Sequence, residues 1–88
     1  MASGDALYAD NMLMISALKG SYPEKALALA QQSYDSYDSP PELLPDLISL
    51  NKQQNNQVAV IKYYSVCASK SFSMTDNKLL DNCNKAKS

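Results

Sequence analysis

The sequence predicts an all-α fold of about five antiparallel helices in a single domain, residues 1–88. Apolar residues recur at intervals of three and four along most of the chain, and no long segment alternates apolar with polar residues. With 2 Gly and 4 Pro, the chain has little scope for the many tight turns of a β-sandwich. A composition of 45% apolar and 19% charged residues is typical of a globular chain and not of a disordered one.

Five groups of apolar residues locate the helices. We expect them over about residues 5–19, 23–36, 41–53, 57–71 and 76–86. In chain order the groups are Leu7, Leu13, Met14, Ala17 and Leu18; Ala26, Leu27, Leu29, Ala30, Tyr34 and Tyr37; Leu43, Leu44, Leu47, Ile48 and Leu50; Val58, Ile61, Tyr64, Cys67 and Ala68; and Leu79, Leu80 and Cys83. Because the connecting segments are short, neighbouring helices should pack antiparallel.

Turn residues indicate where the first three helices begin and end. Residues 21–24 and 39–42 both fit a capping box, in which the serine accepts a backbone hydrogen bond and the glutamate three residues later reaches back. Pro40 takes the favoured first helical position of the second box. Gly20 stands where a left-handed residue would end the first helix.

The later boundaries follow from proline and from polar caps. Pro45 would remove a backbone hydrogen bond inside the third helix, so we expect an irregular or 3₁₀ first turn and a regular helix from Pro45 onward. Asn55 and Asn56 supply the next break and an N-cap. Ser73 or Thr75 is expected to cap the last helix.

An internal repeat appears when the chain is compared with itself at an offset of 34 residues. Residues 26–30 then align with residues 60–64, and Ser33 aligns with Cys67. Residues 20–27 contain Gly-Ser-Tyr followed by Glu-Lys-Ala-Leu, which resembles the turn and second-helix start of a tetratricopeptide repeat. Residues 61–64 resemble the aromatic stretch of the same helix. Pro40 ends the first unit near where that family places a proline.

The resemblance covers about residues 6–72, which is two degenerate repeats, and it makes the fifth helix a cap on the stack. An unrelated small helical bundle is the alternative fold. The resemblance implies a partner-binding groove on the first helix of each repeat. Carried over position by position, the groove residues of the first repeat are Leu7, Asp10, Met14, Ala17 and Leu18. Those of the second repeat are Glu42, Pro45, Ser49, Lys52 and Gln53. Met12, Met14 and Leu18 are alternatively ordinary core residues.

The residue inventory argues against catalysis and against nucleic-acid binding. There is no His, so the commonest general acid–base group is missing and a Ser or Cys nucleophile would lack its usual partner. All 8 basic residues are Lys, which cannot form the bidentate fork that Arg offers to phosphate or guanine. We therefore expect no enzyme activity, no cofactor, no metal site, no nucleic-acid partner and no transmembrane segment.

Two cysteines, Cys67 and Cys83, leave the compartment open. They are either two small apolar side chains in a reducing cytoplasm or a disulfide between neighbouring helices in a periplasmic or secreted protein. The first residues have no basic segment before an apolar one and do not resemble a secretory signal, although a leader could have been replaced there. The expectation is cytoplasmic, with the oxidising compartment as the alternative.

Three functions fit these observations. The first is a small adaptor or chaperone that holds an amphipathic helix or peptide of another protein, as in secretion or pilus assembly machinery. The second is a disulfide-stapled periplasmic pilot lipoprotein or immunity protein. The third is a fragment of a longer helical solenoid, whose exposed ends would make the chain self-associate.

Overall fold

The computed structural model describes the backbone of residues 2–88 and the side chains of residues 7–88. In chain order the elements are α1 (Ala2–Leu18), α2 (Pro23–Ser36), the 3₁₀ turn η1 (Pro41–Leu43), α3 (Leu44–Gln53), α4 (Gln57–Met74) and α5 (Asn77–Lys87). Residues 2–88 contain five helices and no strand, so the all-α prediction is confirmed. The first helix begins three residues earlier than expected and the fourth ends three residues later.

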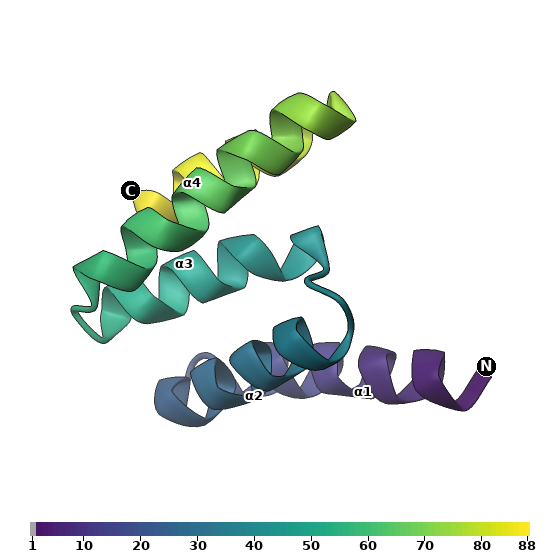
Figure 1. Cartoon of the computed structure of the whole chain (residues 1–88). Coiled ribbons are helices and arrows are strands. Elements are labelled where there is room, and N and C mark those ends of the chain that lie inside the picture. Colours follow the sequence, from purple (N-terminus) through teal and green to yellow (C-terminus); the bar gives the residue numbers. More distant parts are fainter. Residues whose placement is uncertain (1) are drawn as a thin grey trace.

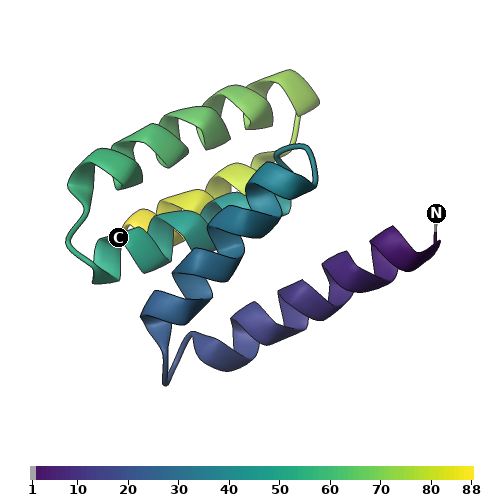
Figure 2. The same cartoon turned by 60° about the horizontal axis from the view of Figure 1, so that its bottom comes forward.

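The helices form two antiparallel hairpins, α1–α2 and α3–α4, and α5 returns beside α4 (Figure 1). Helix α3 is central, because it packs against α2, α4 and α5, whereas α1 packs mainly on α2. Two views show α1 and α4 at opposite ends of the molecule (Figures 1 and 2). The molecule measures 31 × 29 × 18 Å, so it is only about two helices thick and every helix keeps an exposed face.

The hydrophobic core is centred on η1 and α3. The surrounding helices contribute small or flat side chains to it, and α1 contributes one fully buried residue among its described side chains. The core consists of Leu43, Leu44, Leu47, Ile48 and Leu50, surrounded by Ile15, Ala26, Ala30, Tyr34, Val60, Tyr63, Cys67, Leu79 and Cys83. The shortest α-helix therefore supplies the largest share of the buried aliphatic side chains.

Proline, and not serine, sets the start of α2 and of η1. Pro23 is the first residue of α2, so the N-cap is Tyr22, and Ser21 lies one residue too early to cap the helix. Pro41 starts η1 in the same way and makes Pro40 the N-cap, with no side-chain hydrogen bond. Both predicted capping boxes are wrong for this reason. Gly20 also departs from expectation, because its φ is not positive.

The prediction for the third helix is confirmed: a 3₁₀ turn precedes it, and the regular helix begins at Leu44, one residue before Pro45. Asn56 caps α4, since its side-chain oxygen accepts a hydrogen bond from the backbone N–H of Ala59 at 3.3 Å. Asp76 caps α5, since its side-chain oxygen accepts a hydrogen bond from the backbone N–H of Leu79 at 3.0 Å. The predicted caps, Ser73 and Thr75, are therefore wrong.

Thr75 instead ends α4 in the left-handed conformation, with φ 55° and ψ 42°. A β-branched residue is strained there, and glycine is not. We expect Thr75→Gly to raise the free energy of unfolding by about 1 kcal/mol, as measured by urea denaturation. Asn55→Gly is the matched control, because Asn55 has a similar φ of 60° but asparagine tolerates it. A Thr75→Gly variant no more stable than the original would contradict the strain.

Candidate protein-binding surface

Helix α1 is apolar around most of its circumference, yet only Ile15 among its described side chains is fully buried. Leu7, Leu13 and Met14 are 58%, 71% and 55% exposed. Met12 and Leu18 are half-buried and pack against the core. A helix that is apolar on all sides is normally covered on all sides, so this exposure marks α1 as a candidate binding element.

Three apolar residues of α1 share one flank. Successive helical residues point about 100° apart, so residues seven or eleven positions apart nearly coincide in direction. Leu7, Met14 and Leu18 therefore lie along one line, with Asn11 between Leu7 and Met14, and we call these three apolar residues the α1 strip. Exposed Asp10 and Ala17 lie along its edge.

A different flank of α1 faces the third helix. The ammonium group of Lys19 binds a carboxylate oxygen of Asp46 at 2.7 Å. Near the other end of α1, the hydroxyl of Tyr8 donates to a carboxylate oxygen of Glu42 at 2.7 Å. Tyr8 and Lys19 are eleven residues apart and so point in the same direction, about 100° from the α1 strip. The α1 strip therefore points to the side of the flank that contacts η1 and α3.

Eight of the ten predicted groove residues fall into two groups. Leu7, Asp10, Met14, Ala17 and Leu18 lie on and beside the α1 strip, whereas Ser49, Lys52 and Gln53 lie on the outer face of α3. Ser49 and Lys52 are half-buried and Gln53 is exposed. The residues within each group share one face of a helix, whereas the side-chain bonds that join the region of α1 to η1 and α3 are made by Tyr8 and Lys19.

The contact between α1 and η1 changes the environment of a tyrosine. Partial burial, together with the hydrogen bond to Glu42 and the nearby negative charges of Glu42 and Asp46, raises the pKa of Tyr8. Its ring also packs on the ring of Tyr37, with centroids 5.1 Å apart. Tyr8 therefore acts as a hydrogen-bond donor and a packing group that docks α1.

Helix α4 carries a second exposed apolar line that the sequence pattern did not reveal. Val58, Ile61 and Phe72 are 80%, 65% and 90% exposed. They point within about 60° of one another, and we call them the α4 strip. The sequence grouped Val58 and Ile61 with Cys67, but Cys67 is on the opposite, buried face with Val60, Tyr63 and Ser71. Helix α4 has apolar residues on both faces, so spacing alone could not decide between them.

The buried face of α4 is tied to α5 by a disulfide between Cys67 and Cys83, both fully buried. A bond between these helices belongs to the second of the two interpretations of the cysteine pair, and the periplasmic or secreted compartment of that interpretation stays a prediction. Two further contacts join the same helices. The hydroxyl of Tyr64 donates to the side-chain oxygen of Asn84, and the ammonium group of Lys87 lies 4.2 Å from the centre of the Tyr64 ring.

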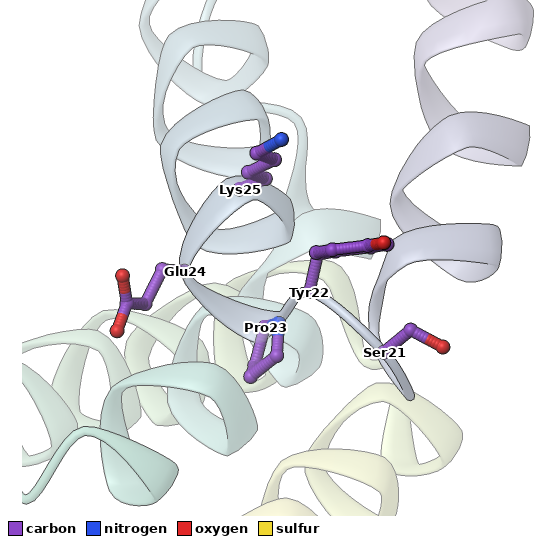
Figure 3. A pocket seen from close by; sticks show the side chains of 5 residues that line it. All are labelled: Ser21, Tyr22, Pro23, Glu24 and Lys25. Atoms are coloured by element: carbon purple, nitrogen blue, oxygen red, sulfur yellow. The ribbon is translucent and has the colours of Figure 1, made fainter.

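Two shallow surface depressions offer little to a small molecule. One, of about 270 Å³, surrounds the turn between α1 and α2 and is lined by the five consecutive residues Ser21–Lys25. Figure 3 shows that their side chains spread in different directions and do not converge on a common point. Ligand sites need polar groups that converge within an apolar pocket, and this depression has none.

The other depression lies between η1 and the start of α5. Its lining residues are Glu42, Pro45, Asp76, Lys78, Leu79 and Asn82. Both carboxylates already have structural roles, because Glu42 binds Tyr8 and Asp76 caps α5. Of the predicted groove residues, Glu42 and Pro45 line this depression, and the other eight line neither depression. Within the described part of the chain, no three metal-ligating side chains cluster.

Comparison with known proteins adds no relative. Neither protein-family models, nor curated proteins, nor solved structures gave a match to this chain. The tetratricopeptide-repeat resemblance therefore stays a prediction. Across residues 2–88, none of the helices combines the length and the apolar character needed to cross a bilayer.

Proposed function

We propose that this protein is a non-catalytic binding module that holds an amphipathic helix or peptide of a partner protein against the α1 strip. The observation that carries the proposal is the exposure of Leu7 and Met14, which lie two turns apart on one flank of α1 with Leu18 completing the line. An apolar line of three residues at helical spacing matches the anchor pattern by which helices dock in grooves.

The chemistry of the strip suits a helical partner. Methionine is flexible and polarisable and adapts to different apolar surfaces. Asp10 at the edge of the strip would favour a partner with a basic residue beside its apolar face. Since Lys19 and Tyr8 fix another flank of α1 to Asp46 and Glu42, the strip is presented on a helix that is held in place.

The repeat-like organisation supports the same function. Ala26 and Val60, which align in the sequence, are both buried in their helices, and so are Ser33 and Cys67. In each pair the first residue lies in α2 and the second in α4, and these are the second helices of the two hairpins. Stacked hairpins with a common period serve mainly as protein-binding scaffolds. An adaptor or chaperone in a secretion or pilus assembly machine is the finer form of this proposal, by analogy of size and architecture alone.

The disulfide favours a second candidate. A structural bond between buried cysteines is typical of periplasmic and secreted proteins. A stapled periplasmic pilot or immunity protein would also be a binding module, in an oxidising compartment and not in the cytoplasm. Titration of thiols in the unfolded, unreduced protein from its natural source separates the candidates: no reactive thiol favours the periplasmic form, and two favour the cytoplasmic form.

The binding site is tested by crosslinking from the strip itself. A photoreactive amino acid in place of Met14 should crosslink in the producing cells to a helical segment of a partner, which mass spectrometry of the crosslinked peptide identifies. Leu7→Glu with Met14→Glu should weaken capture of that partner about tenfold or more, because two carboxylates would be desolvated at the contact.

The matched control is Leu13→Glu, which changes an equally exposed leucine of the same helix on another flank. It should leave capture unchanged, and circular dichroism should show the same helix content for all variants. Equal capture by the double variant and by the unchanged protein would overturn the proposed function.

A further inference from the structure

The α4 strip has a basic edge. Helix α4 contains Lys62 and Lys70 and no acidic residue. Lys62 is exposed, one residue after Ile61 and four after Val58, and its ammonium group lies over the ring of Tyr63 at 5.3 Å. The uncovered face of α4 therefore carries three exposed apolar residues, with exposed Ser65 and Ser69 between Ile61 and Phe72, beside a positive charge.

The α1 strip has the opposite charge. Helix α1 contains two aspartates and no basic residue, and exposed Asp10 lies between Leu7 and Met14. The α1 strip spans about 17 Å from Leu7 to Leu18, and the α4 strip spans about 21 Å from Val58 to Phe72. The two lines are thus comparable in length and complementary in charge.

The two strips cannot meet within one molecule, because α1 and α4 lie at opposite ends of it (Figures 1 and 2). They can meet between two molecules. Pairing like with like would bring together two strips whose edges carry the same charge, Lys62 on both or Asp10 on both, and so would gain no attraction between opposite charges. Pairing α1 of one molecule with α4 of another places Asp10 near Lys62 and buries both apolar lines.

We infer that the helix held by the α1 strip is α4 of a second copy of this chain, so that copies join head to tail. This inference rests on the proposed function, since it names the occupant of the same strip. A contact between two different surfaces leaves one strip free at each end of the pair, and further copies add until the chain closes into a ring or continues as a filament.

Two complementary variants, each with one strip disrupted, test the head-to-tail contact directly. One variant carries Leu7→Glu and Met14→Glu and keeps its α4 strip; the other carries Ile61→Glu and Phe72→Glu and keeps its α1 strip. In sedimentation velocity, the mass of the unchanged protein should rise with concentration into the millimolar range. Each variant alone should remain a monomer, and an equimolar mixture should give a one-to-one dimer and nothing larger.

Leu13→Glu and Met74→Glu are the controls, because they alter exposed residues on other flanks of α1 and α4. Both should associate like the unchanged protein. A mixture that stays monomeric, or an unchanged protein that is monomeric at every concentration, would overturn the inference.

Charge reversal gives an independent test of the pairing. Asp10→Lys alone and Lys62→Glu alone should each weaken association about fivefold at low salt. A chain with both changes should associate as well as the unchanged protein, since the two charges have exchanged places. If the double reversal is as weak as the single ones, the two residues do not face each other, and the inferred contact is wrong.

The crosslink from position 14 separates this inference from the proposed function. A crosslinked peptide from residues 57–74 of another copy supports both. A crosslink to a helix of a different protein, together with a monomeric unchanged chain, removes the inference and leaves the proposed function standing. Absence of any crosslink, with capture unaffected by the strip variants, removes both.

Discussion

Replacing both Cys67 and Cys83 by alanine is expected to lower the free energy of unfolding by about 3 kcal/mol. The bond closes a loop with a sequence separation of 16 residues, and a loop of that length corresponds to about 3 kcal/mol of lost freedom in the unfolded chain. The free energy of unfolding of a domain of this size is only about 5–10 kcal/mol, so the loss is a large fraction of its stability.

The effect should be concentrated in α5. That helix has 11 residues and buries only Leu79 and Cys83, and so short a helix is marginal in water on its own. In the alanine variant, hydrogen exchange should show that the amides of α5 lose protection first. The amides of α3 should still exchange only through global unfolding of the protein. Reduction of the unchanged protein is the matched experiment, because it breaks the same bond without removing the sulfur atoms. A loss below about 1 kcal/mol in both would contradict the prediction.

Leu47→Ala is expected to lower the free energy of unfolding by about 3 kcal/mol, which is within the range for truncating a fully buried leucine. Leu47 lies on α3, which packs against α2, α4 and α5, so the substitution perturbs the contacts of three helices directly and those of α1 through α2. Circular dichroism and tyrosine fluorescence should therefore report one coincident transition at a lower urea concentration.

Ser49→Ala is the control for Leu47→Ala. Ser49 is half-buried on the outer face of the same helix, and its replacement should change stability by less than about 0.5 kcal/mol. Two separated transitions in the Leu47→Ala variant, or a cost no greater than that of Ser49→Ala, would show that α3 is not the centre of the folding unit.

Most of the fold was predictable because proline and polar caps act locally. Pro23 fixes the start of α2, Pro45 forces a 3₁₀ turn before α3, and Asn56 caps α4. The errors arose where two local signals competed. A serine and a proline both marked the start of α2, and the proline at the first helical position took precedence. Thr75 had the composition of a cap for α5 but became the end of α4.

The candidate surface was only half predictable, for a reason specific to α1 and α4. Both helices have apolar residues on more than one face, so periodicity shows that they are helical but not which face is buried. Ile15 alone is fully buried among the described side chains of α1, yet the apolar group predicted for this helix did not include it, whereas Leu13 and Met14, which the group did include, are exposed. On α4 the face bearing Cys67 is buried because the bond to Cys83 and the packing of α3 lie on that side.

The order in which the helices touch has a consequence for how the protein is made. Each helix packs on its neighbour in the chain, and α3 with α5 is the main exception. Contacts between helices that are neighbours in the sequence favour folding within microseconds to milliseconds. Disulfide formation takes seconds or longer. The newly made chain should therefore bring Cys67 beside Cys83 before any oxidant reaches them, so that oxidation locks a helix pair already in place and does not guide its formation.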